Sequence, residues 1–410
     1  MKRRAAELGL LLGSLFAALL AVELGLRLFT RYPLDDAKTQ QPDPVLRWRM
    51  RPELAGIDDR GFRNAAALAS AEVVAIGDSH TYGFNASPED SWPAQLERLT
   101  GRTVYNLGVG GYGLLEYWYL LDEALALQPR EILVGVYVVN DLADVCARLL
   151  DVPYWRPWLH ARGIDGDRCG SAAPHEARRH ERDIWERLGL ATAVGSLWGV
   201  ATADQRMRFD IWRGAVEKAF VVDVPGTRTV MYHRWLRGKR ESTDPARPQV
   251  AVALEVARRF LAEGRERSTA RGSGFGVLLI PSKEVVYARY LAEIGYPRPE
   301  VYDADVHGEE LGTAALVRVL DELGIPWIDA RPGLERALVE VGDLYPLHRD
   351  DHPFAPGYRA YAEAARELLG RMKPAVTARQ ALAAGSDPLA TLGRSATRTP
   401  PLVAVPLLTR

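Results

Sequence analysis

The sequence predicts an α/β fold in which a parallel sheet is covered by helices on both faces. Short aliphatic and β-branched runs alternate along the chain with longer segments of helical periodicity, a pattern typical of parallel strands joined by helices. Polar or glycine-rich sequences follow several of these runs, where parallel sheets carry their functional groups. With 47% hydrophobic and 26% charged residues over 410 positions, the composition is that of an ordinary globular protein.

The predicted elements follow one another from residue 72 to residue 373. We expect strands at 72–76, 103–107, 132–139, 275–280 and 327–329, and helices near 88–100, 114–128, 249–265, 309–323 and 356–373. The central sheet should therefore hold about five parallel strands.

Residues 150–248 interrupt this alternation and are predicted to form one large, mostly helical insertion. They contain six of the ten tryptophans: Trp155, Trp158, Trp185, Trp198, Trp212 and Trp235. These indole rings could line a substrate cleft and stack on sugar faces, or they could fill a small core of the insertion itself. The basic run 233–240 is expected to be a solvated surface loop, although it could also contact lipid headgroups or an anionic glycan.

Residues 1–30 have the pattern of a signal anchor or a signal peptide. Met-Lys-Arg-Arg precedes an apolar stretch from Leu8 to Val22, which reaches spanning length only by tolerating Glu23 and Arg27. The lack of a clean Ala-x-Ala cleavage site favours an uncleaved anchor over a cleaved signal. Because the basic cluster should stay cytoplasmic, we expect a single-pass protein in which everything after about residue 30 lies outside the membrane.

The remaining chain is expected to divide into three parts. Residues 31–65, rich in Pro, Arg and Asp, are predicted to form a stem, residues 66–374 the main domain, and residues 375–410 a disordered tail. The net charge of −1 argues against a nucleic-acid partner, because such a protein needs a basic excess to displace counterions from phosphates. Cys146 and Cys169 could form a disulfide outside the cytoplasm or remain two buried thiols.

Ser79 is the candidate nucleophile. The first predicted strand delivers it in Gly-Asp-Ser, at a turn into a helix, where its hydroxyl would be exposed and its N–H would face a forming anion. The motif alone is weak, because most Asp-Ser pairs only cap helices. His80 and Tyr82, which follow the serine, are expected either to shape a substrate pocket or to serve in capping and packing.

Ester chemistry on serine also needs a base, an acid that orients the base, and donors for the oxyanion. His352 stands in Arg-Asp-Asp-His near the end of the last strand and helix unit, and an imidazole is mostly neutral outside the cell. An acidic residue one or two positions earlier can hold its ring. The glycine-rich run 106–113 offers unobstructed N–H groups, and Asn140, at the end of the third strand, offers an amide.

The order Gly-Asp-Ser, Asn-x-Gly-x-x-Gly, Asn-Asp and Asp-x-His resembles the SGNH (GDSL) hydrolase superfamily. Ser79, Gly111, Asn140 and His352 match the four residues that name the family, and the anchored arrangement resembles membrane-tethered bacterial members. The resemblance therefore implies a single-pass protein of a bacterial inner membrane, with its catalytic domain periplasmic or extracellular. The similarity covers roughly residues 70–150 and 270–370. It implies a flavodoxin-like, three-layer α/β/α fold and an oxyanion hole formed by the N–H groups of Ser79 and Gly111 and the side chain of Asn140. It also implies esterase or acyltransferase chemistry, which needs no metal or cofactor.

The acid of the triad departs from the commonest family pattern. That pattern puts the aspartate three residues before the histidine, where this sequence has Arg349. Branches that O-acetylate exopolysaccharides use Asp-x-His, and Asp350 fits that spacing. We therefore predict a catalytic triad of Ser79, Asp350 and His352, with Asp351 as the lesser candidate for the acid.

These residues predict a serine esterase that acts outside the cytoplasm on an O-acylated carbohydrate or another ester. The first alternative is an O-acetyltransferase for a cell-surface polysaccharide, because both reactions pass through one acyl-serine. The second is a non-catalytic glycan-binding or assembly component that keeps the fold.

Three other readings fail on spacing or on a missing motif. The run 108–113 satisfies G-x-G-x-x-G, but the acid expected about 20 residues later is Asp141, which follows Gly113 by 141 − 113 = 28 residues. His175 and His180 resemble part of a zinc protease motif, but a spacing of five splays them roughly 140° apart on a helix. No G-x-S-x-G sequence indicates an α/β-hydrolase nucleophile elbow.

Overall fold

The computed structural model of the protein describes residues 13–14, 18–19, 39–54, 56–169, 219–346 and 350–372. Apart from two short pairs, the signal segment predicted for 1–30 lies outside the described residues, as do the predicted tail at 375–410 and Trp185, Trp198 and Trp212. Within the described ranges, the structure has no helix with the length and apolar character needed to cross a membrane.

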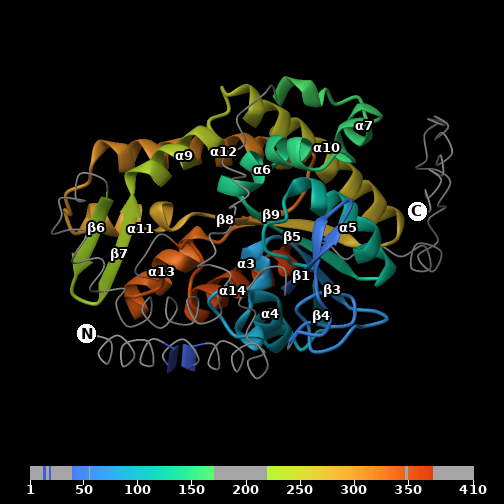
Figure 1. The fold of residues 1–410 in the computed structure, drawn as a ribbon, viewed down its shortest axis with the longest axis horizontal. Coiled ribbons are helices and arrows are strands. Elements are labelled where there is room, and N and C mark those ends of the chain that lie inside the picture. The colour runs from blue at the N-terminus through green and yellow to red at the C-terminus, as the bar shows by residue number, and fades with distance from the viewer. Residues whose placement is uncertain are drawn as a thin grey trace, which may run out of the picture.

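A parallel sheet forms the centre of the molecule (Figure 1). Its five strands are β3 (Val73–Ile76), β4 (Val104–Asn106), β5 (Glu131–Tyr137), β8 (Gly274–Ile280) and β9 (Trp327–Asp329), in the order β4-β3-β5-β8-β9. All neighbouring pairs are parallel. Counted along the chain this order is 2-1-3-4-5, that of the flavodoxin-like fold. The predicted fold class is confirmed.

Both faces of the sheet are buried, so successive side chains of a strand enter different cores. Val74 and Ile76 of β3 belong to one hydrophobic cluster, and Val73 and Ala75 belong to the other. The first cluster includes α5 (Leu114–Ala126), α6 (Val138–Asp151) and α10 (Pro248–Ala270); the second includes α4 (Trp92–Thr100), α11 (Lys283–Glu293), α13 (Arg331–Val341) and α14 (Ala355–Arg371). The result is a three-layer sandwich; α12 (Glu300–Glu322) contributes to both clusters.

The third strand ends earlier than expected, and this moves Asn140 onto a helix. The buried carboxylate of Asp141 accepts hydrogen bonds from Tyr137 N–H (2.9 Å) and from Tyr117 Oη (2.9 Å). The first of these bonds turns the chain at the end of β5, and α6 begins at Val138. Asn140 therefore lies in the first turn of α6.

The second half of the predicted stem packs on the domain. Strands β1 (Gln40–Asp43) and β2 (Arg47–Met50) form an antiparallel hairpin, and Leu46 and Phe62 are buried in the core. The Pro-, Arg- and Asp-rich composition of this segment shows no period, so its few apolar anchors were not recognised. The packing brings Trp48 to the glycine-rich loop that follows β4.

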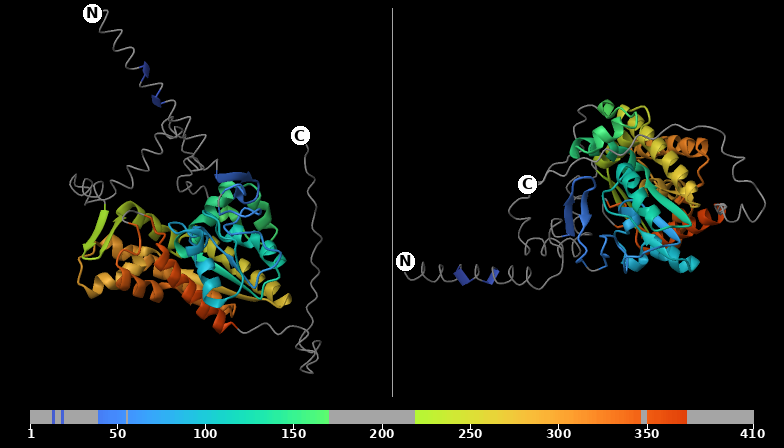
Figure 2. Two further views of the ribbon diagram at one scale, coloured as in Figure 1. Left: turned by 90° about the horizontal axis from the view of Figure 1, so that it is seen from below. Right: turned by 90° about the vertical axis from the view of Figure 1, so that its right-hand side faces the viewer.

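The described parts of the insertion contain strands as well as helices. They form α7 (Trp155–His160), the 3₁₀ helix η2 (Gly166–Cys169), the hairpin of β6 (Ala219–Val224) and β7 (Thr227–Tyr232), and α9 (His233–Thr243). The hairpin and α7 lie at opposite ends of the molecule (Figures 1 and 2). The basic run 233–240 is part of α9, in which Leu236 and Lys239 are buried. The expectation of a solvated loop there is wrong. The segment is a helix that packs along α12, and its Lys239 pairs with the buried Glu284.

The start of the insertion is joined to the main core. Trp155 is buried, and its ring lies 5.3 Å from that of Trp158, which in turn lies 4.6 Å from Trp118 of α5. These two insertion tryptophans thus fill a core. Cys146 of α6 and Cys169 form a disulfide with a Cα to Cα distance of 5.5 Å. Of the two states considered for the cysteines, the structure has the bonded one.

Candidate active site

The carboxyl ends of three adjacent strands bring together the residues that the motifs singled out. Ser79 follows β3, Gly111 lies in the loop after β4, and Asn140 lies in the first turn after β5. Because β4, β3 and β5 are neighbours in a parallel sheet, these residues meet at one edge. His352 reaches the same edge from the loop before α14.

Ser79 is the first residue of the short helix α3 (Ser79–Tyr82). The buried carboxylate of Asp78 caps this helix and accepts a hydrogen bond from His80 N–H at 2.9 Å. Gly83 ends it with a φ of 93°, a left-handed conformation that glycine adopts without strain. Asp78 is fully buried whereas Ser79 is only partly buried, so at this turn the serine and not the aspartate reaches the surface.

Ser79, His352 and Asp350 form a continuous chain of hydrogen-bond contacts. Ser79 Oγ lies 2.7 Å from His352 Nε2, and His352 Nδ1 lies 2.6 Å from Asp350 Oδ1. The same carboxylate oxygen also accepts the backbone N–H of His352 at 3.0 Å. The Nδ1-protonated tautomer can therefore donate to Asp350 while its Nε2 accepts the serine proton.

The surroundings of Asp350 keep its carboxyl group ionised beside the imidazole of His352. Burial alone would raise the pKa of its carboxyl group, but hydrogen bonds and the charge of His352, helped by a hydrogen bond from Asn85, hold that pKa below its ordinary value. Asp350 is therefore ionised at neutral pH and can stabilise a positive charge that develops on His352.

Asp351 points away from the histidine that follows it. Its Oδ2 accepts a hydrogen bond from Tyr137 Oη at 2.9 Å and pairs with Lys239 Nζ at 2.7 Å. Burial would raise the pKa of Asp351, but the charges of Lys239 and Lys283 outweigh it and lower that pKa. Of the two acids that the sequence offered, only Asp350 contacts His352 in the described part of the chain.

The glycine-rich loop lies directly against the nucleophile turn, residues 77–83, which carries the candidate nucleophile Ser79. A Cβ on Gly108 would come within 2.5 Å of the backbone nitrogen of Tyr82, so only glycine permits this approach. Gly111 has a φ of 77°, and its carbonyl accepts a hydrogen bond from Arg148. The neighbouring carbonyl of Gly110 accepts one from Trp48 Nε1 at 3.3 Å. Two side chains thus hold the orientation of this loop.

The predicted oxyanion donors have unused hydrogen-bonding capacity. Among the described residues, neither the backbone N–H of Ser79 nor that of Gly111 donates a hydrogen bond to a backbone carbonyl. Asn140 Nδ2 donates to Asp78 Oδ2 at 3.0 Å, which uses one of its two hydrogens and orients the amide. The Asp78 carboxylate therefore both caps α3 and holds Asn140.

Of the two proposed pocket residues, His80 packs behind the ring of His352. It is 1% exposed, and its ring centroid lies 4.5 Å from that of His352 and 4.2 Å from that of Tyr137. Burial, reinforced by the charge of His352, places the pKa of His80 well below its ordinary value. His80 is thus a neutral packing residue, the second of the two roles considered for it.

Tyr82 and Phe84 extend from the nucleophile turn toward the surface. The Tyr82 ring lies under the guanidinium of Arg63, 4.6 Å from its centre, and 5.2 Å from the ring of Phe84. Phe84 is 44% exposed, and its ring centroid lies 5.2 Å from that of His352. Sequence patterns did not single out Phe84, because nothing in the motif indicates which following residue turns toward the histidine.

Asn85 is a further residue that the sequence did not indicate. Its Nδ2 donates to Asp350 Oδ2 at 3.1 Å and to His352 O at 3.0 Å, and its φ of 62° is left-handed. Asparagine tolerates that backbone conformation better than most residues do. Asn85 follows the nucleophile by six positions with no motif around it, so only its spatial position reveals the contact.

In the ranges that the structure describes, no group of three or more His, Cys, Asp and Glu side chains is placed to hold a metal ion.

Neither the models of protein families nor the curated proteins contain a match to this sequence. Solved structures that match include a protein described as lipolytic and of the G-D-S-L family from Desulfitobacterium hafniense DCB-2 (15% identity, TM-score 0.32, 73% of this chain and 99% of that chain). A catalytic mutant of an acetylxylan esterase from Geobacillus stearothermophilus matches at 12% identity and TM-score 0.34, over 74% of this chain and 96% of that chain. Phospholipase A1 from Streptomyces albidoflavus NA297 matches at 9% identity and TM-score 0.35, over 74% of this chain and 100% of that chain.

At these identities and TM-scores, the function has to be inferred from the chain's own residues. The chain is similar to SGNH (GDSL) hydrolases in the order of its motifs, in its parallel sheet, and in the serine, histidine and aspartate that meet at the edge of that sheet.

Proposed function

We propose that the protein is a serine esterase of the SGNH type. Ser79 is the nucleophile, His352 the general base and acid, and Asp350 the residue that orients and charges the histidine. The observation that carries the proposal is the hydrogen-bond chain from Ser79 Oγ to His352 Nε2 (2.7 Å) and from His352 Nδ1 to Asp350 Oδ1 (2.6 Å).

Acylation of the serine follows from this arrangement. Ser79 Oγ attacks the ester carbonyl carbon while His352 Nε2 takes the hydroxyl proton, and Asp350 stabilises the resulting imidazolium. The N–H groups of Ser79 and Gly111 and the Asn140 amide donate to the tetrahedral oxyanion. When the tetrahedral intermediate collapses, the ester C–O bond breaks and His352 returns the proton to the leaving alcohol.

Deacylation repeats these steps with water. His352 takes a proton from the water, whose oxygen attacks the acyl-serine carbonyl, and the proton then goes to Ser79 Oγ as the acid departs. A sugar hydroxyl that replaced water at this step would receive the acyl group, which is the chemistry of the O-acetyltransferase alternative.

We propose an O-acylated carbohydrate outside the cytoplasm as the substrate. The exposed ring of Phe84 beside His352 supports this, because a sugar ring of the leaving alcohol can stack on an aromatic face there. The basic and then apolar N-terminal sequence supports export on an anchor. The disulfide between Cys146 and Cys169 supports an oxidising compartment.

Covalent labelling of the full-length protein with a fluorophosphonate tests the nucleophile. We expect one phosphonyl adduct by intact mass, mapping to Ser79, and none in Ser79→Ala or His352→Ala. Circular dichroism of both variants establishes that they are folded. A folded wild-type protein that takes up no adduct would contradict the esterase proposal.

A further inference from the structure

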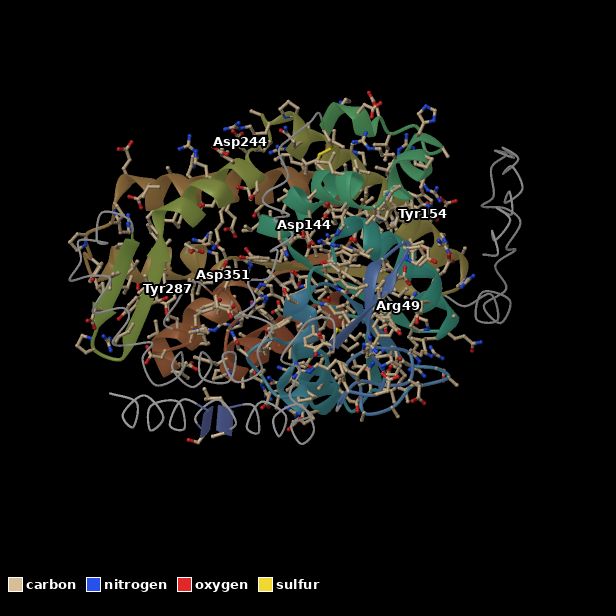
Figure 3. The ribbon with its side chains drawn as sticks, in the orientation of Figure 1. Arg49, Asp144, Tyr154, Asp244, Tyr287 and Asp351 are labelled. Carbon is tan, nitrogen blue, oxygen red and sulfur yellow. A yellow bond between two sulfur atoms is a disulfide. The ribbon has the colours of Figure 1, made fainter. Side chains whose placement is uncertain are left out.

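A cluster of ionisable side chains, all buried except the partly buried Asp351, lies behind the catalytic loop (residues 350–354), and the proposed mechanism makes no use of it. Its members come from α9, α11, α12 and the loop itself: Lys239, Lys283, Glu284, Asp305, Glu309 and Asp351. Buried charges are costly unless they are paired, so such a cluster constrains the elements that contribute to it. Asp351, labelled in Figure 3, lies below α9 in that view.

The insertion contributes Lys239 to this cluster, from a helix, α9, whose position is closely constrained. Helix α9 packs against α12 at two glycines one turn apart: a Cβ on Gly312 would lie 2.6 Å from the carbonyl oxygen of Thr243, and one on Gly308 would lie 3.4 Å from the Cα of Arg240. Ser242 Oγ also donates to Val139 O of α6 at 3.2 Å. Lys239 therefore extends from a helix whose backbone is held on two sides.

Lys239 connects this helix to the catalytic loop. Its Nζ lies 2.7 Å from Asp351 Oδ2 and also pairs with Glu284 of α11. The Lys239 side chain is 10% exposed, and burial would lower its pKa, but the charges of Asp351 and Glu284 outweigh burial and raise it. Lys239 is therefore a permanent cation that has its two carboxylate partners within the protein.

The position of Asp351 in the loop lets this contact act on the triad. Asp351 stands between Asp350 and His352, and its side chain points into the protein while theirs meet at the site. A second lysine, Lys283, supports the same stretch by donating to the carbonyl oxygen of Asp350 at 3.3 Å. The backbone that places Asp350 and His352 is thus held from inside at adjacent residues.

We propose that Lys239 is a positioning residue for the catalytic loop, and that the insertion contributes to catalysis by docking it through Asp351. This inference rests on the proposed esterase function. Holding the loop from α9 keeps His352 Nε2 at hydrogen-bond distance from Ser79 Oγ. A displacement of about 1 Å at such a site can cost about 100-fold in rate.

The test measures fluorophosphonate labelling rates and steady-state hydrolysis of 4-nitrophenyl acetate by the full-length protein. Lys239→Met keeps the length of the side chain and removes its charge, and Asp351→Asn keeps the shape of the acid. We expect each to lower kcat and the labelling rate roughly 10- to 100-fold, with KM changed less than about 2-fold. The double variant should lose little more than either single variant, because both break one contact.

Glu284→Gln is the matched control, since it removes the other partner of the same lysine without touching the loop. We expect it to lower the melting temperature and leave kcat at 25 °C within about 2-fold. If Glu284→Gln lowered kcat as much as Asp351→Asn, the cluster would act through general stability and the inference would be wrong.

Two further outcomes would separate this inference from the proposed function. A wild-type protein without labelling would contradict the esterase itself. Labelled wild-type protein together with a folded Asp351→Asn variant that reacts at the wild-type rate would contradict only the positioning role of Lys239. Because asparagine is isosteric with aspartate, Asp351→Asn decides the question even if Lys239→Met does not fold.

Discussion

The nucleophile turn (residues 77–83) and the catalytic loop (residues 350–354) are held in place by contacts of different kinds. In the turn, the two helix caps are local: Asp78 accepts a hydrogen bond from His80 N–H and Gly83 N–H donates to Ser79 O, all within six residues of sequence. Side chains distant in sequence add to these caps, as Arg63 does by donating to the carbonyl oxygens of Tyr82 and Gly83. In the loop, the side chains that hold Asp350 to His352 come from Asn85, Lys239 and Lys283, the nearest of them 67 residues away.

This difference has consequences for how substitutions act. Local contacts form as soon as the chain turns, whereas the loop contacts require α9, α11 and the segment after α3 to be packed first. Substitutions far from the chemistry should therefore move the base more readily than the nucleophile.

The largest expected effect separates the two neighbouring acids. Asp350→Asn should lower kcat on the order of 10³- to 10⁴-fold, because an amide cannot stabilise the imidazolium and can present the wrong partner to His352 Nδ1. Asp351→Asn should lose no more than about 100-fold. Steady-state kinetics with 4-nitrophenyl acetate would measure both. Equal losses of kcat in the two variants would contradict the conclusion that Asp350, and not Asp351, is the acid that acts on His352.

Asn140→Ala tests the predicted oxyanion donor that Asp78 of the nucleophile turn holds in place. Loss of one oxyanion donor should reduce kcat about 10²- to 10³-fold with little change in KM. The fluorophosphonate labelling rate should fall as well, because the phosphonyl oxygen would use the same donors. If kcat stayed within about 3-fold of wild type, Asn140 would serve only to satisfy Asp78.

The buried cluster behind the loop should make stability depend on pH. Burial raises the pKa of Glu309 from 4.5 to about 7, partly offset by hydrogen bonds from Ser282. The unfolded chain releases this proton from about pH 4.5 and the folded protein only near pH 7, so stability falls as pH rises across that window. Glu309→Gln avoids this cost and should be more stable than wild type by roughly 3 kcal/mol at pH 8, with little gain at pH 4.

Chemical denaturation at both pH values would measure the effect of Glu309→Gln. Glu310→Gln is the control: it is the next residue of α12 and pairs with Arg331 at the surface, so we expect no comparable gain at pH 8. A Glu309→Gln variant less stable than wild type at pH 8 would mean that the carboxylate is ionised and satisfied in the folded protein.

The smallest expected effect concerns Asn85, which supports the loop from the exposed side. Asn85→Gly keeps the left-handed backbone and removes only the side-chain contacts with Asp350 and His352. Two partly exposed hydrogen bonds are worth about 1 kcal/mol or somewhat more, so kcat/KM should fall roughly 5- to 10-fold. Asn85→Asp should lose more, because its carboxylate would face Asp350. Wild-type kinetics in both variants would mean that the interior contacts alone hold the loop.

Much of the fold was predictable because its signals are local. The three inner strands β3, β5 and β8 are buried on both faces, so each is apolar along nearly all of its length and stands out from the helices between them. The hairpin at residues 40–50 and the helix α9 were not predictable. Each is held by contacts to residues distant in sequence, such as Trp48 to Gly110 and Lys239 to Asp351.

By itself, the sequence determined the α/β class, the strands of the sheet, and the candidate serine, glycine, asparagine and histidine, because periodicity and motif spacing are properties of neighbouring residues. Only the tertiary structure decided that Asp350 and not Asp351 faces His352, and that His80 packs behind the triad. It also decided that Asn85 contacts Asp350 and that Lys239 contacts Asp351. The physical reason is that these orientations depend on which buried charge or ring is near, and the nearest ones come from distant parts of the chain.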